Sequence, residues 1–534
     1  SDIVTITDIN NDSVDDLTIE IVDIGGIDYY QISDPNLVIS TSGLAGADLM
    51  RPDANTVQVR VGAVTGGVTV DTTGPAPGVE GGDTVTITSL PMSISGNVAI
   101  TSESVILDGG ITATGDVTVT GATTLGASVN VDGANVTFNG TVGMGANNLT
   151  VTTSVGGAAN GIISGTGNFT KAGAGTFALN AANDFTGTAT VSAGELDLGL
   201  AGAIADTVDV SVAAMATLDL NNFDETIDEL GGAGSVTLGT ATFTIGSDNG
   251  TNTFSGIISG DGALTKIGSG MQTLSGENTF SGGLTLEAGT LRAENRTATA
   301  TSTVLGNGDL QLNDGQLEIA AEVNTNFGSA NAATVGGDVT IVIDRLVAGG
   351  NVTHTLVGSL SIGANTLTAV VGDFVTSQFA GVNVGAVTLT GNATFNTDKA
   401  VAGDPLSVIN VNGLTDDTGS SFSLTKTGSD LLQFGGGTYN FNGTFLQQGT
   451  LRVSAANALQ GTTDVSGGAL ELRNGNGAAQ SDVLVSGNAS VNLLNNNATN
   501  FVAGSLTVDP GITMTLQSRS VNANTGLTHQ FTAT

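Results

Sequence analysis

A stretch near the N-terminus, DINNDSVDD, has the residue types and spacing of a calcium-binding loop. Asp8, Asn10 and Asp12 stand at alternate positions, and Asp16 follows them. Calcium loops place hard oxygen ligands at alternate positions in this way. The four residues are therefore candidate ligands for Ca2+. Ser13 stands where such a loop usually has glycine, which leaves a polar hairpin turn without an ion as the alternative.

Three lysines, Lys171, Lys266 and Lys426, recur in glycine-rich surroundings in a chain that has only 12 lysine and arginine residues. A catalytic lysine needs an acid or base partner within reach, and no such partner recurs beside these three. The two histidines, His354 and His529, lie far apart in the sequence, and the chain has no Gly-x-Ser-x-Gly, phosphate-loop or His-Glu-x-x-His motif. The sequence therefore predicts that the protein is not an enzyme and that the lysines are structural.

The composition argues against several classes of partner. The formal charge is −37 at pH 7, whereas nucleic-acid binding requires a basic surface that neutralises phosphates. An anionic membrane surface would repel the chain for the same reason. No apolar stretch approaches the roughly 20 residues that a membrane-spanning helix needs. The absence of cysteine excludes a disulfide framework and thiol chemistry.

Short strands are the elements that the sequence predicts throughout. Stretches such as GDVTVTGATTL and SVNVDGANVTF alternate apolar with small polar residues and are bounded by Gly, Asn and Asp. Helical periodicity is nearly absent. Glycine accounts for 79 residues and aromatic residues for 4% of the chain, which leaves few large side chains to fill the centre of a globule of 534 residues. This composition favours a thin core between stacked strands.

The lysines mark an internal repeat. Each is preceded by Thr, and Gly, Gly and Leu follow it at the same three offsets in every copy. The three copies comprise Lys171, Gly173, Gly194 and Leu196, then Lys266, Gly268, Gly289 and Leu291, and then Lys426, Gly428, Gly449 and Leu451. Self-similarity at a fixed spacing is the signature of a repeat architecture.

The pattern G-x-L-T-K-x-G-x-G, followed by F-x-G and then by x-G-x-L, resembles the autotransporter-associated β-strand repeat of bacterial secreted and surface passenger domains. The resemblance covers three segments, about a fifth of the chain. It implies an all-β fold, a right-handed parallel β-helix, and a location outside the cell at the bacterial surface.

In a parallel β-helix, a coil buries its apolar face only by stacking on its neighbours. Alternating Leu, Val, Ile and Phe then fill the interior, and Gly occupies corners that need a positive φ. We therefore expect the repeated Leu to face inward and the second Gly of each copy to form a corner. Each lysine is expected just past a strand, with its ammonium group facing a carboxylate or a free carbonyl.

The N-terminal segment differs in composition from the rest of the chain. Five of the seven prolines lie at or before Pro91, and two of the three tyrosines are Tyr29 and Tyr30. We predict that residues 1–90 form an acidic β-rich module or end cap and that residues 91–534 form the parallel β-helix. A repeat array needs a cap because its terminal coil otherwise exposes unpaired strand edges.

These features together predict a structural protein of the bacterial cell surface, a filament, lattice or stalk subunit that associates with copies of itself. An adhesin that binds surface glycans or host ligands is the first alternative. A β-helix enzyme that degrades polysaccharides is the second. That enzyme would need clustered carboxylates and aromatic residues that stack on sugars, and the chain has no Trp and three Tyr.

Overall fold

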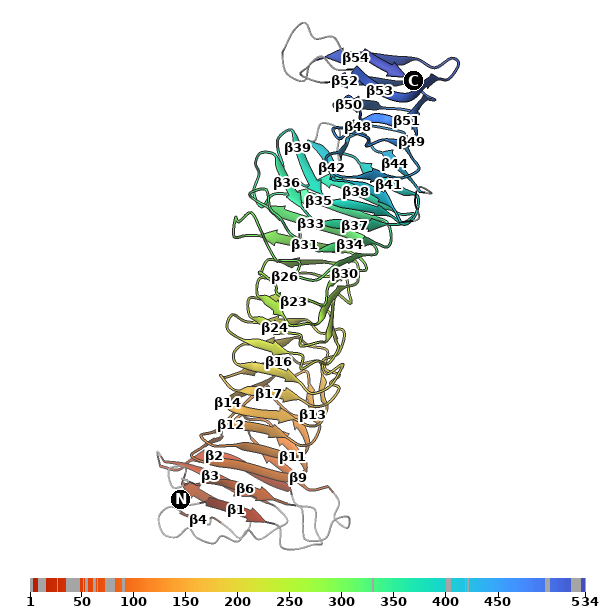
Figure 1. The fold of residues 1–534 in the computed structure, drawn as a ribbon. Coiled ribbons are helices and arrows are strands. Elements are labelled where there is room, and N and C mark those ends of the chain that lie inside the picture. Colours follow the sequence, from red (N-terminus) through yellow and green to blue (C-terminus); the bar gives the residue numbers. More distant parts are fainter. Residues whose placement is uncertain are drawn as a thin grey trace. The chain divides into compact units, whose positions relative to one another are not determined.

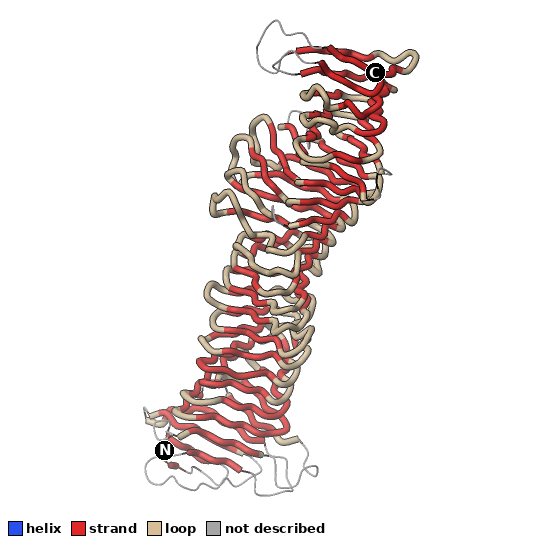
Figure 2. The backbone as a smooth tube through the Cα atoms, viewed as in Figure 1, coloured by secondary structure: helices blue, strands red, loops and turns tan. Residues whose placement is uncertain are grey.

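The fold is that of a computed structural model, which describes residues 3–7, 16–25, 27–34, 49–50, 52, 56–60, 64, 66–72, 82–88, 92–328, 331–399, 405–417, 419, 422–494, 500–519 and 530–533. Within these residues the chain forms strands, turns and bends and no helix (Figure 2). Accordingly, this part of the chain contains no helix that could cross a membrane.

The chain divides into two compact units. Unit 1 comprises Ser1–Ser247 and Ser255–Gly262, and unit 2 comprises Asp248–Phe254 and Ala263–Thr534. Each unit is built from short, mostly parallel strands that stack coil upon coil (Figure 1). The prediction of an all-β fold and a parallel β-helix is confirmed in both units.

The strands fall between the two units as follows. Unit 1 contains β1 (Ile3–Thr7), β2 (Asp16–Asp23), β3 (Asp28–Ser33), β4 (Leu49–Met50), β5 (Thr56–Arg60), β6 (Gly67–Asp71), β7 (Thr84–Ile87), β8 (Met92–Ile94), β9 (Asn97–Leu107), β10 (Ile111–Ala113), β11 (Val117–Leu125), β12 (Val129–Phe138), β13 (Val142–Gly145), β14 (Leu149–Ala159), β15 (Ile163–Gly165), β16 (Phe169–Ala172), β17 (Thr176–Leu179), β18 (Ala189–Val191), β19 (Glu195–Leu198), β20 (Val210–Val212), β21 (Thr217–Asp219), β22 (Glu225–Ile227), β23 (Leu230–Gly232), β24 (Ser235–Thr237), β25 (Thr242–Ile245) and β27 (Ile257–Ser259). Unit 2 contains β26 (Thr251–Phe254), β28 (Ala263–Lys266), β29 (Met271–Leu274), β30 (Leu284–Leu286), β31 (Thr290–Asn295), β32 (Leu310–Leu312), β33 (Gly315–Ala321), β34 (Ala332–Val335), β35 (Val339–Asp344), β36 (Val352–Thr355), β37 (Ser359–Ile362), β38 (Thr366–Val371), β39 (Phe379–Asn383), β40 (Ala386–Leu389), β41 (Ala393–Thr397), β42 (Leu406–Val411), β43 (Leu414–Asp416), β44 (Ser423–Thr427), β45 (Leu431–Phe434), β46 (Tyr439–Asn440), β47 (Gly443–Leu446), β48 (Thr450–Val453), β49 (Gln460–Val465), β50 (Ala469–Leu472), β51 (Ala478–Val485), β52 (Ala489–Leu494), β53 (Asn500–Val508), β54 (Met514–Arg519) and β55 (Gln530–Ala533).

The core of unit 1 consists of side chains that stack in register from coil to coil. One row passes through β12, β14, β16, β18 and β20 and contains Val129, Leu149, Phe169, Ala189 and Val210. Each partner lies one coil further along the chain, and all five are buried. Side chains of a strand point alternately to its two faces, so the residues between them face outward. The regular spacing of the row shows that successive coils of this unit are nearly equal in length.

The first strands of unit 1 contain antiparallel pairs. β2 pairs antiparallel with β3, β3 with β5, and β5 with β4. β6 and β7 pair parallel with β9, which lies beyond residue 90. Strands on the two sides of the expected boundary at residues 90 and 91 thus belong to one sheet, and they join the acidic segment to the array as an end cap would be joined. That residues 1–90 form a separate domain stays a prediction.

Unit 2 contains three parallel ladders of described strands. One runs from β26 through β29, β31, β33, β35 and β38 to β55, a second from β28 to β46, and a third from β36 to β54. In the second ladder, Leu264 partners Leu284, and Leu284 partners Leu310 across a longer stretch of sequence. The coil that follows β30 is therefore longer, and the added residues lie outside strands, between β31 and β32.

Candidate functional site

The predicted calcium ligands Asp8, Asn10 and Asp12 lie outside the described residues. Asp16, the fourth, is the first residue of β2, where it is exposed and stands in register with Thr84 of β7. Calcium binding by this stretch therefore stays a prediction.

The repeated lysines lie inside the coils. Lys171, Lys266 and Lys426 are at most 1% exposed, although lysine is seldom fully buried. They belong to β16, β28 and β44, and not to the segments just past these strands as the sequence suggested. The difference arises because each lysine takes an inward position of its strand, two residues after a buried Phe or Leu.

A buried ammonium group needs hydrogen-bond acceptors, and the backbone supplies them. Lys171 Nζ donates to the carbonyl oxygens of Ala172 at 2.8 Å, Gly173 at 3.0 Å and, from the next coil, Ala193 at 3.2 Å. Burial lowers the pKa of Lys171 to about 8, an effect that the nearby carboxylate of Glu195 opposes. The lysine thus donates hydrogen bonds to carbonyl groups of two successive coils at one corner.

Lys426 repeats this arrangement in unit 2. Its Nζ donates to Gly428 O at 2.8 Å and to Gln448 O at 3.4 Å, and also to the carbonyl of the residue after it. Burial lowers the pKa of Lys426 to about 8, and Asp430 and Asp398 oppose the shift.

The glycines of the repeat complete the same corner. Gly173 O accepts from Lys171, and a Cβ placed on Gly194 in the next coil would lie 2.5 Å from that oxygen. Gly194 also has a φ of +67°, a region that favours glycine. The other copies repeat the contact, at 2.4 Å between Gly289 and Gly268 O and at 2.4 Å between Gly449 and Gly428 O. The spacing of lysine and glycine therefore allows two successive coils to approach closely at one carbonyl group, which also accepts the hydrogen bond from the lysine.

The outward residue that follows the repeated leucine is charged in all three copies. Leu196, Leu291 and Leu451 are fully buried, so the next residue of each strand points outward. The outward residues and their register partners on the next coil are Asp197 with Asp219, Arg292 with Glu318, and Arg452 with Glu471. The repeat thus places ionic groups on an outer face of the coils.

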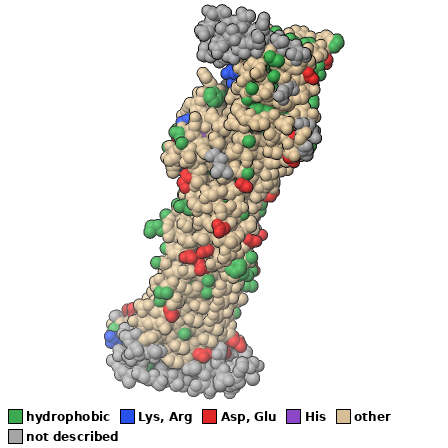
Figure 3. Space-filling view, in the orientation of Figure 1, with side chains coloured by type: hydrophobic (Ala, Val, Ile, Leu, Met, Phe, Trp, Pro, Cys, Tyr) green, Lys and Arg blue, Asp and Glu red, His purple; other side chains and the backbone are tan. Residues whose placement is uncertain are grey.

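Acidic side chains predominate among the charged groups on the surface of the described coils. On the side that Figure 3 shows, Asp and Glu are scattered singly or in small groups, and few Lys and Arg lie among them. This distribution agrees with the formal charge of −37. Places where several charges gather are therefore unusual, and two of them lie next to the repeat.

Of the residues that the structure describes, Glu195, Asp197 and Asp219 in unit 1 bring carboxylate oxygens within 4.8 Å of one another, close enough to share a cation. Burial, a hydrogen bond with Glu195 and the charges of Glu195 and Asp219 together raise the pKa of Asp197 to about 7, and a hydrogen bond with Asn221 opposes the rise. A proton shared between two carboxylates relieves the repulsion in such a cluster, so the three groups can lie this close together at neutral pH without a bound metal ion.

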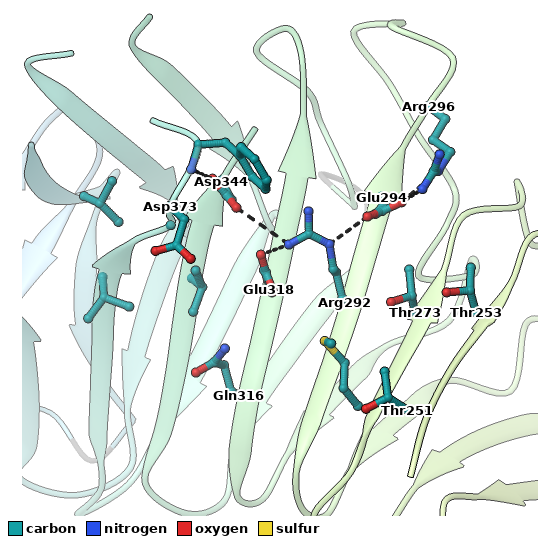
Figure 4. A pocket seen from close by; sticks show the side chains of 16 residues that line it. Thr251, Thr253, Thr273, Arg292, Glu294, Arg296, Gln316, Glu318, Asp344 and Asp373 are labelled. Carbon is teal, nitrogen blue, oxygen red and sulfur yellow. Dashed lines mark hydrogen bonds and ion pairs between the residues drawn. The ribbon is translucent and has the colours of Figure 1, made fainter. Parts of the chain in front are cut away.

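A groove of about 480 Å³ lies on the outward face of the first ladder of unit 2 (Figure 4). Register partners on five successive strands form its floor, namely Thr253, Thr273, Arg292, Glu318 and Val342. The segment that follows β38, residues 372–374, also lines the groove. Thr273, Glu318 and Val342 are buried although they face outward from their strands, whereas Thr253 is exposed.

Arg292 is the centre of an ion-pair network in this groove. Its Nε donates to Glu294 Oε1 at 2.7 Å, and its Nη1 donates to Glu318 and lies 3.6 Å from Asp344 Oδ2 (Figure 4). The other oxygen of Glu294 is paired with Arg296 at 2.5 Å. The three carboxylate residues are buried, so the pairing is made where water screens it little.

Asp344 is fixed from its own side of the groove. Its Oδ1 accepts from the backbone N–H of Phe374 at 2.9 Å. Behind it, the His354 ring lies 3.0 Å from Asp344 O through Nε2, and its Nδ1 accepts from the Thr325 N–H at 3.2 Å, so the proton is on Nε2. Burial lowers the pKa of His354 to about 4 and raises that of Asp344, where backbone N–H groups and Arg292 oppose the rise. The imidazole is therefore neutral and holds the strand that carries Asp344.

The sequence reasoning did not predict this groove. Its carboxylates lie between residues 294 and 373, on different coils, so their proximity depends on the lengths of the coils between them. One signal was present: LRAENR, at the end of the second repeat, places two of the chain's 12 basic residues close to a glutamate, with Arg292 and Glu294 in β31 and Arg296 in the turn after it. A clustering of charge in a chain with 11% charged residues marks an unusual outer face.

Comparison with known proteins identifies the repeat. Residues 169–198, 264–293, 424–453 and 449–472 match the passenger-associated transport repeat. The first three contain the copies marked by the lysines, and the fourth is a copy that lysine spacing does not mark. The chain is also 30% identical over 278 residues to the Adhesin BmaC autotransporter of Brucella suis biovar 1 (strain 1330). That match spans 51% of this chain and 7% of the adhesin's length. No solved structure matches the chain.

Proposed function

We propose that this chain, which carries the β-helix repeats of autotransporter passengers, is an adhesive segment displayed at the bacterial surface. The observation that carries the proposal is the similarity to an autotransporter adhesin over 278 residues, about half of the chain. The passenger-associated transport repeats support the same location outside the cell. The parallel ladders supply a rigid support on whose outer face side chains are held in fixed register.

A binding role agrees better with the groove than a catalytic one does. Glycoside hydrolysis needs one carboxyl group as a general acid and a second that is free to act as base or nucleophile. Of the four carboxylates that line the groove, three are held in place: Glu294 and Glu318 are paired with Arg292, and Asp344 accepts a backbone N–H. Incubation of the chain with plant and bacterial polysaccharides is expected to release no reducing ends and no unsaturated products. Release of either would contradict the non-enzymatic role.

The adhesive function is testable with the purified 534-residue chain. Fluorescent microspheres coated with the chain at a measured density are applied to epithelial cells and to immobilised extracellular-matrix glycoproteins. Control microspheres carry the same chain after heat unfolding, so that charge and composition are matched. Retention of the native-coated spheres well above the controls is expected, and equal retention on every surface would refute the proposal.

Self-association into filaments or a lattice stays a prediction from the sequence. Light scattering from the isolated chain, with and without Ca2+, decides it: a monomer at every concentration in both conditions would end the prediction. An effect of Ca2+ on the scattering would in turn support the calcium assignment at Asp8, Asn10, Asp12 and Asp16.

A further inference from the structure

We propose that the groove around Arg292 binds the neutral pyranose units of an oligosaccharide and discriminates against acidic sugars. This inference rests on the proposed adhesive function, because it names the class of ligand that the adhesive surface takes and the place where it binds. It follows from the size of the groove, its polar groups, its apolar wall and its charge.

The size of the groove suits a small part of a longer oligosaccharide. Its volume of about 480 Å³ lies within the range of roughly 300–1,000 Å³ that small-ligand pockets have. The groove crosses strands β26 to β38 on an outer face, so a ligand longer than its volume can continue over the neighbouring coils.

The polar groups of the groove are arranged for hydroxyl groups. A sugar hydroxyl donates one hydrogen bond and accepts others, so it is best met by a donor and an acceptor held side by side. Arg292 and Glu318 supply this pair on adjacent strands, and their mutual ion pair fixes both before a ligand arrives. Thr251, Thr253 and Gln316 add hydroxyl and amide groups that are at least partly exposed.

One side of the groove is apolar. The Phe374 side chain is 40% exposed, an unusual position for a large aromatic residue in a chain with 4% aromatic residues. It adjoins the segment that ends β38, where Val371 also lines the groove, and Val342 lies on the floor. The C–H face of a pyranose can pack on such a surface while its hydroxyls reach the charged side.

Charge decides between classes of sugar. Four carboxylates and two guanidinium groups line the groove, which gives a formal charge of −2 when all are ionised. A uronic or sialic acid would bring a further negative charge into this field, and both guanidinium groups are already paired with Glu294. A cationic peptide side chain would meet three carboxylates that are already paired with Arg292, and only Asp373 of the groove lies outside this network. Neutral hydroxyl groups add no charge to the groove and leave the ion pairs of Arg292 intact, because they bind the carboxylate lone pairs and guanidinium N–H groups that these ion pairs do not use.

Matched pairs of sugars test the inference. Lactose is compared with sialyllactose, and cellobiose with cellobiouronic acid, by saturation-transfer difference NMR and titration calorimetry on the full chain. Binding of at least one neutral disaccharide is expected, with its acidic counterpart weaker by about tenfold or more. Equal or tighter binding of the acidic counterparts, no binding of any neutral sugar, or binding of an oligolysine peptide in place of sugars would overturn the inference.

Two variants locate the site without touching the ion-pair network. Gln316→Leu and Phe374→Ser are each expected to weaken neutral-sugar binding by about fivefold to tenfold. Gln311→Leu is the matched control for the first, because Gln311 is also an outward, partly exposed residue but lies in the second ladder, in β32. Phe445→Ser is the control for the second, because Phe445 in β47 is 42% exposed and does not line the groove.

The same variants separate this inference from the adhesive function on which it rests. If microspheres coated with Gln316→Leu or Phe374→Ser chain adhere like the wild type and sugar binding is also unchanged, the groove is not the site, whereas adhesion by another surface stands. If wild-type microspheres adhere no better than unfolded controls, the adhesive function itself fails. Loss of both sugar binding and adhesion in the two groove variants, with both controls intact, supports the two together.

Discussion

Replacing Gly194 by alanine should destabilise unit 1 far more than the same replacement at Gly202. The two glycines have nearly the same backbone conformation, with φ of +67° and +66°. Their surroundings differ: a Cβ on Gly194 would lie 2.4 Å from Gly175 O and 2.5 Å from Gly173 O, whereas a Cβ on Gly202 would have nothing within 4 Å. The pair therefore separates the cost of the backbone conformation from the cost of stacking one coil on another.

The magnitudes follow from these two terms. At either position alanine costs about 1–2 kcal/mol because of the left-handed conformation, and it recovers about 0.4–1 kcal/mol by restricting the unfolded chain. Gly202→Ala should thus lower the free energy of unfolding by about 1 kcal/mol. Gly194→Ala adds overlap with backbone atoms that cannot rotate away, and overpacking of this kind costs about 1–3 kcal/mol more. A total of about 3 kcal/mol is expected for Gly194→Ala.

Guanidinium unfolding of the full chain, followed by circular dichroism, measures the difference between the two variants. Repeat arrays need not unfold in one step, so hydrogen exchange of peptides from residues 169–198 should be read alongside. Faster exchange in that segment is expected for Gly194→Ala, with little change for Gly202→Ala. Equal loss of stability in the two variants, or unchanged exchange in Gly194→Ala, would refute the assignment of Gly194 to a packed corner.

Three further predictions concern the buried charges. Lys426 has a pKa of about 8 in the folded chain, below its ordinary value of 10.5. The free energy of unfolding of the wild type should therefore rise from pH 8 to pH 10, because the contribution of Lys426 is complete above the higher pKa and is lost as pH falls through the lower one. Lys426→Met should remove roughly 2 kcal/mol of that rise, measured by denaturant titration at both pH values. The contribution of neutral His354 is present above pH 6.5 and is lost as pH falls through about 4, so thermal midpoints should drop across this interval and His354→Gln should drop less steeply. Arg292→Met leaves three carboxylates without their shared partner and should cost about 3–5 kcal/mol at pH 7. The loss should be smaller at pH 5, where carboxylates take up protons more readily, and an equal loss at both pH values would argue against a charge effect.

The fold was predictable because the repeat encodes it locally. Period-two alternation gives strands, and the fixed distance from Lys171 to Gly194 and Leu196 gives a coil that returns to the same corner. The inward position of the lysine was not predictable from type alone, because lysine is usually exposed. Its burial is possible only because carbonyl groups of two coils converge on its ammonium group, and that convergence is a property of the stack.

The groove was beyond sequence reasoning for a different reason. Arg292 and Glu318 are register partners, and so are Glu318 and Val342, because of the lengths of the two coils that separate them. Both coils are longer than the coils that join Val129 to Leu149 and Leu149 to Phe169 in unit 1, so no fixed period predicts which outward residues meet. Only the charged segment LRAENR indicated that this face differs from the rest.

The longer coils of unit 2 also affect how the sequence of such a chain can change during evolution. Leu284 and Leu310 remain partners across an interval that contains the segment 296–309, which belongs to no strand, so the ladder accepts inserted sequence without a change of register. Mutation can therefore lengthen, shorten or rewrite these loops while each inherited strand keeps its neighbour. Relatives built on the same ladders are free to present different recognition surfaces to a host, and selection can act on the loops alone.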